Sequence, residues 1–378
     1  MVTSSAPLVL VDDPAALREL CARLADAPVA ALDTESNGMH AYRERVCLLQ
    51  ISVPDGDFVI DPLVVDPAPL GVWLGEPASC KVLHAADNDV RVLGRDFGLR
   101  LVNVFDTMLA ARALAWPQKG LGDILAAHFG CKTDKRWQKH DWSTRPLRSD
   151  ALEYARNDTR HLAALRELQL VELEAAGVLE EIEHACLRMT DLVMRPRVFD
   201  PRGWAGVDGA RDLDDVGRSV LAALYVWREQ LAESMDRAPY RVLGESVLLE
   251  LATARPTNRR DVVATRGVGG PVAHRHAQSL LDCIARASTS EPPPWPDPPP
   301  RQEKALRTRI DALRDWRRKH AATRKLEPDI ILSKDAMTRI AEVDPQDHDA
   351  LVACGALDAW ELERYAEAIS AALARLRA

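Results

Sequence analysis

An internal repeat in the second half of this chain constrains its fold more than any other feature of the sequence. Eight residues recur at one constant offset of 89 positions, in the pairs Leu224/Leu313, Trp227/Trp316, Arg228/Arg317, Ala232/Ala321, Pro239/Pro328, Leu243/Leu332, Ala252/Ala341 and Pro256/Pro345. Matches at a single offset that include a tryptophan and two prolines indicate two copies of one module, and the apolar spacing within the copies is helical. The sequence therefore predicts two all-α domains, over residues 212–288 and 303–378.

A proline-rich stretch over residues 289–302 separates the two copies. Its centre reads Glu291-Pro292-Pro293-Pro294-Trp295-Pro296-Asp297-Pro298-Pro299-Pro300, and ring-locked prolines favour an extended, semi-rigid polyproline conformation. Residues 179–211, in front of the first copy, are predicted to form a connecting helical segment. We expect the two copies to be able to shift relative to each other.

The first 178 residues are organised differently, because short apolar runs alternate there with helical patterns. One short run precedes the expected helix Ala15–Leu24, and others follow at Val29–Thr34, Val46–Val53, Asp57–Ile60, Lys81–His84 and Val102–Phe105. Helical patterns occupy residues 87–96, 107–115, Leu121–Phe129 and Arg148–Ala175. Turn signals such as Pro54-Asp55-Gly56 are typical of hairpin-linked strands, and the later alternation is typical of βα units. This pattern predicts an α/β domain.

No feature of the sequence indicates export or a membrane. Seven cysteines are scattered without CxxC spacing and are typical of buried apolar residues in a reducing compartment. The amino terminus lacks a basic start and a long apolar run, so we expect a cytoplasmic protein without a signal peptide or a membrane span. The sequence has no Walker A motif, which argues against a nucleotide cofactor and against helicase activity.

Charge is segregated along the chain. The net charge is −8, yet Arg301–Lys325 contains ten Lys or Arg residues and only three Asp or Glu. A second basic stretch is interleaved with Trp137 and Trp142 and contains Lys132, Lys135, Arg136, Lys139, Arg145 and Arg148. Local patches matter more than total charge for binding polyanions. Both stretches are therefore candidate contacts for the phosphates and bases of a nucleic acid, with an ordinary solvated surface as the alternative.

Acidic residues follow two of the predicted strands. The run that begins at Val29 ends in Asp33-Thr34-Glu35. A strand projects residues i and i+2 from the same face, so Asp33 and Glu35 should lie on one side. A pair of carboxylates held in this way favours a divalent cation, whereas a solvated strand end is the alternative. Asp87 and Asp89 follow the run Lys81–His84 within the first turn of a helix. The residue types alone leave either of them as a candidate ligand.

A tyrosine and a further aspartate lie close together on a predicted helix. Tyr154 and Asp158 are four residues apart, which places them about one turn apart on one helix face. The same face contains Leu162 and Leu165, so both polar side chains should point inward toward the sheet. An ordinary surface pair is the alternative, because a tyrosine and an aspartate at this helical spacing are common.

Oxygen ligands without His or Cys suit Mg²⁺ or Mn²⁺, which also bind phosphate oxygens. Two such ions can activate a water and stabilise the leaving oxygen during phosphodiester hydrolysis. We therefore expect two divalent metal ions as cofactors, held by Asp33, Glu35, Asp89 and Asp158. Tyr154 is expected to hold the attacking water near the scissile phosphate.

These residues resemble the DEDDy exonucleases, and within them the ribonuclease D family, which includes the eukaryotic exosome-associated relatives. The stretch HAADNDVRVLGRDFGLRLVNVFDTMLAARAL, from His84 to Leu114, looks like that family's second motif, in which the ligand Asp lies five residues after the His. The resemblance selects Asp89 over Asp87. Residues 134–147 resemble the family's DK…Q…DW..RPL segment. Ser36 departs from the pattern, because many members have an aromatic or bulky residue there.

The resemblance implies an RNase H-like exonuclease domain with a mixed five-stranded sheet and hydrolysis from a free 3′ end that releases nucleoside 5′-monophosphates. The LxxWRxxxA core of each repeat resembles the HRDC domain, a small helical unit that binds nucleic acids. The implied partner is RNA with a free 3′ end, such as a tRNA precursor or another small structured RNA. Candidate substrate-binding residues are Thr34, His84, Lys135, Trp142 and Arg145, and a purely structural role is the alternative for His84.

Two other functions remain open from the sequence. The same chemistry can act on DNA in repair, because nothing in the motifs reads the 2′-hydroxyl that distinguishes RNA. The second alternative is a non-catalytic RNA-binding protein that retains a nuclease fold.

Overall fold

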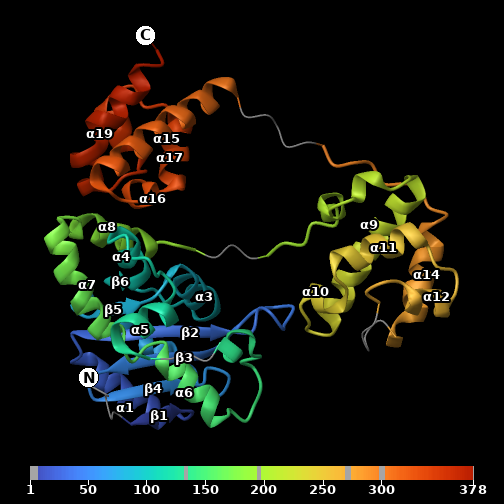
Figure 1. The fold of residues 1–378 in the computed structure, drawn as a ribbon, viewed down its shortest axis with the longest axis horizontal. Helices are drawn as coiled ribbons and strands as arrows, with labels where there is room; N and C mark the ends of the chain where they lie inside the picture. The colour runs from blue at the N-terminus through green and yellow to red at the C-terminus, as the bar shows by residue number, and fades with distance from the viewer. Residues whose placement is uncertain (1–6, 132–134, 194–196, 269–273, 298–302, 378) are drawn as a thin grey trace.

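A computed structural model describes residues 7–131, 135–193, 197–268, 274–297 and 303–377. An amino-terminal α/β domain is followed by two helical modules, which we call the first module (α9 to α14) and the second module (α15 to α19) (Figure 1). None of the helices in these ranges is both long and apolar enough to cross a membrane.

The described part of the amino-terminal domain contains a mixed six-stranded sheet in the order β1-β4-β3-β2-β5-β6. Its strands are β1 (Leu8–Val11), β2 (Val29–Ser36), β3 (Val46–Val53), β4 (Gly56–Ile60), β5 (Cys80–Leu83) and β6 (Val104–Asp106). β2 lies between antiparallel β3 and parallel β5. The expected α/β class is confirmed, but the implied count of five strands is wrong. The apolar run before the first helix adds a sixth strand, because β1 pairs in parallel with β4 at the edge.

Helices cover both faces of this sheet. They are α1 (Pro14–Ala25), α2 (Gly71–Leu74), α3 (Asp87–Phe97), α4 (Thr107–Ala113), α5 (Leu121–Phe129), α6 (Ser149–Asn157), α7 (Leu162–Ala176) and α8 (Leu179–Met189), with short 3-10 turns η1 (Ala68–Leu70) and η2 (Lys135–Lys139). Asp13 caps α1 in front of Pro14, and its carboxylate accepts the amide protons of two residues of the first turn.

The expected single helix Arg148–Ala175 is wrong, because the structure divides it into α6 and α7. The end of α6 tightens into bonds that span three residues, Asp158 N–H to Ala155 O and Thr159 N–H to Arg156 O. Such bonds are common where an α-helix terminates. The interruption begins at Asp158, directly after the last residue of α6, so Asp158 occupies the C-cap of that helix.

The two faces of β2 contact different parts of the core. Ala30 and Leu32 pack with apolar residues of α1 and α3, whereas Ala31 packs with residues of α4 and α7. Side chains alternate along a strand, so Asp33 and Glu35 share the face of Ala31. The acidic residues therefore lie on the side of the sheet that α7 covers.

The two modules confirm the repeat helix by helix. The first contains α9 (Asp215–Ser234), α10 (Pro239–Val242), α11 (Glu245–Ala254), α12 (Arg259–Ala264) and α14 (Ala277–Ala287), after the short turns η3 (Gly203–Gly206) and η4 (Ala210–Asp212). The second contains α15 (Lys304–Arg324), α16 (Pro328–Ile331), α17 (Lys334–Val343), α18 (His348–Cys354) and α19 (Ala359–Ala374). Helices α10 and α11 recur in α16 and α17 at the same offset of 89 residues.

The paired arginines of the repeat have the same structural role in both modules. Arg228 donates to the carbonyl of Leu243, and Arg317 donates to the carbonyl of Leu332. Burial lowers the pKa of both guanidinium groups. Each arginine therefore joins the first long helix of its module to the segment that follows the next helix.

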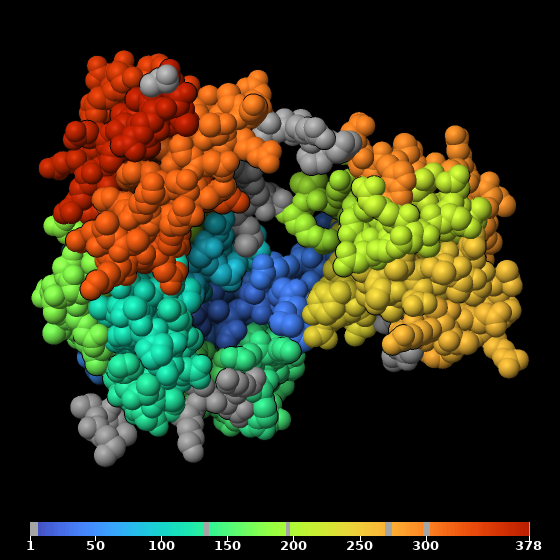
Figure 2. All heavy atoms as spheres, turned by 45° about the horizontal axis from the view of Figure 1, so that its top comes forward, coloured from blue at the N-terminus to red at the C-terminus, as the bar shows by residue number. Residues whose placement is uncertain are grey.

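The two modules contact the amino-terminal domain at different places. The second module shares one continuous apolar cluster with α4, α7 and α8. Ion pairs reinforce this contact, joining Arg112 to Glu327 and Asp329, Arg188 to Glu361, and Arg324 to Glu181. The first module contacts the loop after β2, where Tyr42 donates to Glu229. In the space-filling view the three bodies border a central hollow, with residues of the amino-terminal domain at its floor (Figure 2).

The described part of the proline-rich segment packs on the first module. The ring centroids of Trp295 and buried Trp204 lie 5.0 Å apart. The guanidinium groups of Arg211 and Arg218 lie over the Trp295 ring. Cation–π contacts of this kind are attractive. The start of the linker is therefore held by the first module, while residues 298–302 fall outside the described ranges.

Candidate active site

Three carboxylates from two elements meet at the carboxyl-terminal half of β2. Asp33 and Glu35 extend from the strand, and Asp158 comes from the end of α6. Their ligand atoms all lie within 4.8 Å of one another. Three oxygen ligands at this spacing match the hard-cation chemistry of Mg²⁺ or Mn²⁺.

Asp89 approaches this cluster from the first turn of α3. Its carboxylate is buried, and the hydroxyl of Thr34 donates to its Oδ1 at 2.5 Å. Asp89 lies outside the group of three, but its charge raises the pKa of both Asp33 and Glu35. Asp87 is exposed instead and pairs with Arg91 one turn along the helix. Of the two candidates, Asp89 is the one that interacts with the cluster.

Burial and mutual repulsion oppose ionisation of the carboxylates in the cluster. Burial is the main cause that raises the pKa of Asp33 and of Glu35 well above their usual ranges, and repulsion from the neighbouring carboxylates raises both further. Burial also raises the pKa of Asp89 and of Asp158 to about 7. A bound divalent cation reverses this trend, because its charge favours the ionised carboxylates.

Trp142 is a buried neighbour of the carboxylate cluster. Its side chain is 1% exposed, it hydrogen bonds to Glu35, and its ring stacks on Tyr154 with centroids 6.1 Å apart. The expectation that Trp142 contacts the substrate is corrected here, because so buried a ring offers no face for a base. Trp142 instead links the strand carboxylate Glu35 to the helix residue Tyr154.

The other candidate substrate residues also have internal partners. The guanidinium of Arg145 donates to both oxygens of Asp61 and to the carbonyls of Cys47, Trp142 and Thr144, which gives it a structural role, and its contact with the substrate stays a prediction. Thr34 donates to Asp89. The side chain of Lys135 lies outside the described part of the chain, although its backbone begins η2.

His84 is held against α4. Its Nδ1 lies 2.9 Å from Thr107 Oγ1, and that hydroxyl donates in turn to the carbonyl of Leu83. Burial lowers the pKa of the imidazole. These contacts favour the structural alternative for His84.

Asp106 fixes the turn that presents Asp89. It is fully buried, and its carboxylate accepts four backbone N–H groups, from Ala85, Ala86, Met108 and Leu109. The first two belong to the turn between β5 and α3, and the last two to the first turn of α4. Asp106 therefore caps α4 and also joins two connections of the sheet.

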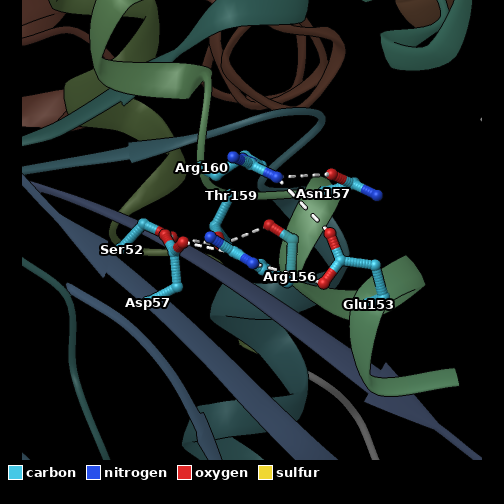
Figure 3. Close-up of polar contacts among 7 residues, drawn as sticks. All are labelled: Ser52, Asp57, Glu153, Arg156, Asn157, Thr159 and Arg160. Carbon is cyan, nitrogen blue, oxygen red and sulfur yellow. Dashed lines mark hydrogen bonds and ion pairs between the residues drawn. The ribbon is translucent and has the colours of Figure 1, made fainter. Parts of the chain in front are cut away.

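A polar network anchors the end of α6 to the sheet (Figure 3). Arg156 Nε donates to Asp57 Oδ2 at 2.6 Å, and Ser52 Oγ donates to Asp57 Oδ1 at 2.6 Å. The hydroxyl groups of Ser52 and Thr159 lie 2.7 Å apart. On the outer side, Glu153 pairs with Arg156 and Arg160. Because Arg156 and Thr159 lie within two residues of Tyr154 and Asp158, the network holds the end of α6 that carries both residues against the sheet.

Replacing Asp57 by alanine is expected to lower the stability of the amino-terminal domain by about 3 kcal/mol, because Arg156 loses its buried partner and keeps only the half-exposed Glu153. Nucleotide release should fall as well, since α6 loses its anchor. Glu153→Ala is the matched control, because its carboxylate is half exposed and exposed pairs contribute at most about 1 kcal/mol. Thermal unfolding of both variants tests this, and equal losses would contradict the anchoring role.

Several residues that shape the site were not identified from the sequence. Ser52, Asp57, Arg156 and Thr159 are ordinary polar residues in the chain, and only the fold brings them together. Gln50 did have a signal, because it is the one strongly polar residue within the apolar run Val46–Val53. It lies directly opposite Asp33 in the pairing of β2 with β3.

Comparison with known proteins matches every domain of the chain. Residues 8–172 match the family model described as 3′-5′ exonuclease, and residues 218–284 and 307–373 each match the HRDC domain. Ribonuclease D of Zymomonas mobilis is 32% identical over 290 residues, which cover 75% of this chain and 73% of that protein.

Two further relatives extend the comparison. The exosome complex component 10 homolog of Caenorhabditis elegans is 33% identical over 287 residues, which cover 74% of this chain; the match spans only 32%, about a third, of that longer protein. The crystal structure of Escherichia coli RNase D, an exoribonuclease involved in structured RNA processing, matches with a TM-score of 0.61 and 25% identity and covers 98% of this chain and 99% of that one. The chain belongs to the ribonuclease D family of 3′–5′ exonucleases, with one exonuclease domain followed by two HRDC domains.

Proposed function

We propose that this protein is a metal-dependent 3′–5′ exoribonuclease that trims structured RNA. The observation that supports this most is the meeting of Asp33, Glu35 and Asp158 within 4.8 Å, in a domain that matches the 3′-5′ exonuclease model. The buried Asp89 beside them completes the four carboxylates that the family resemblance implies.

The proposed ligands of two divalent ions are Asp33, Glu35, Asp89 and Asp158. When bound, the ions would supply an activated water and charge stabilisation for the leaving oxygen. The donor set fits such ions, because it consists of carboxylates that repel one another when ionised. Thr34 and Trp142 contribute by donating to Asp89 and Glu35, which orients the two carboxylates.

Tyr154 is proposed to hold the attacking water with its hydroxyl. Its ring is oriented by stacking on buried Trp142, and its helix is fixed by the ion pair of Arg156 with Asp57. The aromatic ring therefore has little freedom to turn. A group held in this way loses little entropy when it orients a reactant.

The proposed substrate is a tRNA precursor or another small structured RNA with a free 3′ end. Support comes from the two HRDC domains and from the E. coli relative, which is described as acting in structured RNA processing.

Part of the basic stretch of α15 is neutralised internally, since Arg309, Arg314, Arg318 and Arg324 have acidic partners. Exposed cations for phosphate contacts are Lys304, Arg307, Lys319 and Lys325.

An assay of released mononucleotides by mass spectrometry tests the proposal against both alternatives. We expect nucleoside 5′-monophosphates from an RNA hairpin with a single-stranded 3′ end in Mg²⁺ or Mn²⁺, and none with a chelator. A DNA hairpin of the same sequence should react at least about tenfold more slowly. Faster release from DNA would favour a repair nuclease, and no release from either substrate would favour a non-catalytic binding protein.

A further inference from the structure

Gln50 occupies an unusual position beside the carboxylates. It lies in the middle of β3, directly opposite Asp33 on β2. Opposite residues of an antiparallel pair project from the same face, with Cβ atoms about 5 Å apart. Gln50 is 0% exposed, so it cannot contact RNA, and any role it has in the reaction acts through its neighbours.

The amide of Gln50 has no partner among the described residues. Both its nitrogen and its oxygen are buried without a hydrogen bond. Buried polar groups in native proteins are nearly always satisfied, because an unsatisfied donor or acceptor loses its hydration without compensation. An unpaired amide at this position lowers the stability of the fold. We therefore look for a hydrogen-bond partner that Gln50 gains only when a ligand is bound at the site.

A second buried glutamine of the same domain shows the contrast. Gln169 on α7 is also 0% exposed, and its amide oxygen also has no partner among the described residues, but its amide nitrogen donates to the carbonyl of Thr107 at 2.8 Å. It joins α7 to the start of α4 and so contributes to the fold. Gln50 makes no such bond, although apolar residues would suit the interior of β3 better.

We propose that Gln50 is a positioning residue of the metal centre, whose amide donates to the carboxylate of Asp33 when divalent cations are bound. The inference rests on the proposed function, because it assumes that Asp33 is a metal ligand. Ligating carboxylates are commonly held by a further hydrogen bond that fixes their orientation, and losing such a bond weakens metal affinity about 10- to 100-fold.

Gln50→Met separates this role from a structural one, because methionine keeps the length of the side chain without its polar atoms. Without divalent cations, the variant should unfold at the same or a higher temperature than wild type. Its dissociation constant for Mn²⁺, measured by calorimetry on the full chain without RNA, should rise about tenfold or more. Gln169→Met is the control, and we expect it to unfold at a lower temperature with unchanged Mn²⁺ affinity.

Each result decides between the possibilities. Unchanged Mn²⁺ affinity in Gln50→Met, or a lower unfolding temperature without cations, would overturn the positioning role and leave the proposed function intact. Failure of Gln50→Met to fold would overturn it as well, since it would make Gln50 a structural residue. If wild type itself does not bind Mn²⁺, the proposed metal-dependent function fails together with the inference.

Discussion

Replacing Asp33 by asparagine is expected to reduce the release of nucleotides at least about a thousandfold, which corresponds to about 4 kcal/mol of transition-state stabilisation. Asp33 is one of three carboxylates within 4.8 Å, and the amide that replaces it has no negative charge to hold a cation. Single-turnover rates on a 3′-extended RNA hairpin at saturating Mg²⁺ would measure the loss.

The same substitution should stabilise the protein in the absence of cations. The carboxylates of Asp89, Asp158 and Glu35 repel that of Asp33. Asparagine is neutral, so the substitution removes this repulsion. An increase in unfolding temperature with a loss of turnover would show that the fold is intact and that the carboxylate acts in catalysis.

Asp87→Asn is the matched control for this experiment. Asp87 belongs to the same motif as Asp89, but it is exposed and pairs only with Arg91 among the ion pairs of the described residues. We expect wild-type turnover from the control. Substantial turnover in Asp33→Asn, or a comparable loss in Asp87→Asn, would contradict the assignment of the cluster.

The periodicities of the sequence predicted which faces carry the carboxylates, and the family resemblance was needed to join them into one site. Alternation along a strand places Asp33 and Glu35 on one face, and the structure brings Asp158 from α6 to the same place. The 89-residue offset similarly predicted both helical modules. The faces of strands and helices follow from local geometry that repeats every two or 3.6 residues, and the module repeat follows from direct comparison of the sequence with itself. Both can therefore be recognised without knowledge of the fold.

The basic and aromatic stretch before α6 shows where such reasoning fails. Its composition resembles a surface for single-stranded nucleic acid, yet Trp142 is buried and Arg145 is bound to Asp61. Composition does not reveal which way a side chain points in a segment without regular periodicity. The network of Asp57 and Arg156 was missed for a related reason, because its partners are 99 residues apart.

The structure also relates the site to the modules, which the sequence could not do. β2 ends at Ser36, one residue after Glu35, and the loop that follows it contacts the first HRDC domain through Tyr42 and through the carbonyls of Met39 and His40. The strand that carries two of the acids thus continues directly into a domain contact.

Replacing Tyr154 by phenylalanine is expected to lower kcat about a hundredfold while RNA affinity stays within about twofold of wild type, because only the group proposed to position the water is lost. Phenylalanine keeps the ring that stacks on Trp142, so the packing beneath Glu35 should persist. Mn²⁺ affinity should also be unchanged, since the phenol is not a proposed ligand. Single-turnover kinetics measure the loss of rate, and a binding assay measures RNA affinity. The catalytically impaired Asp33→Asn protein serves as the reference in the binding assay, because it does not degrade the RNA. A variant that retains the wild-type rate would remove Tyr154 from the reaction, and one that loses RNA affinity in proportion to rate would make it a substrate contact instead.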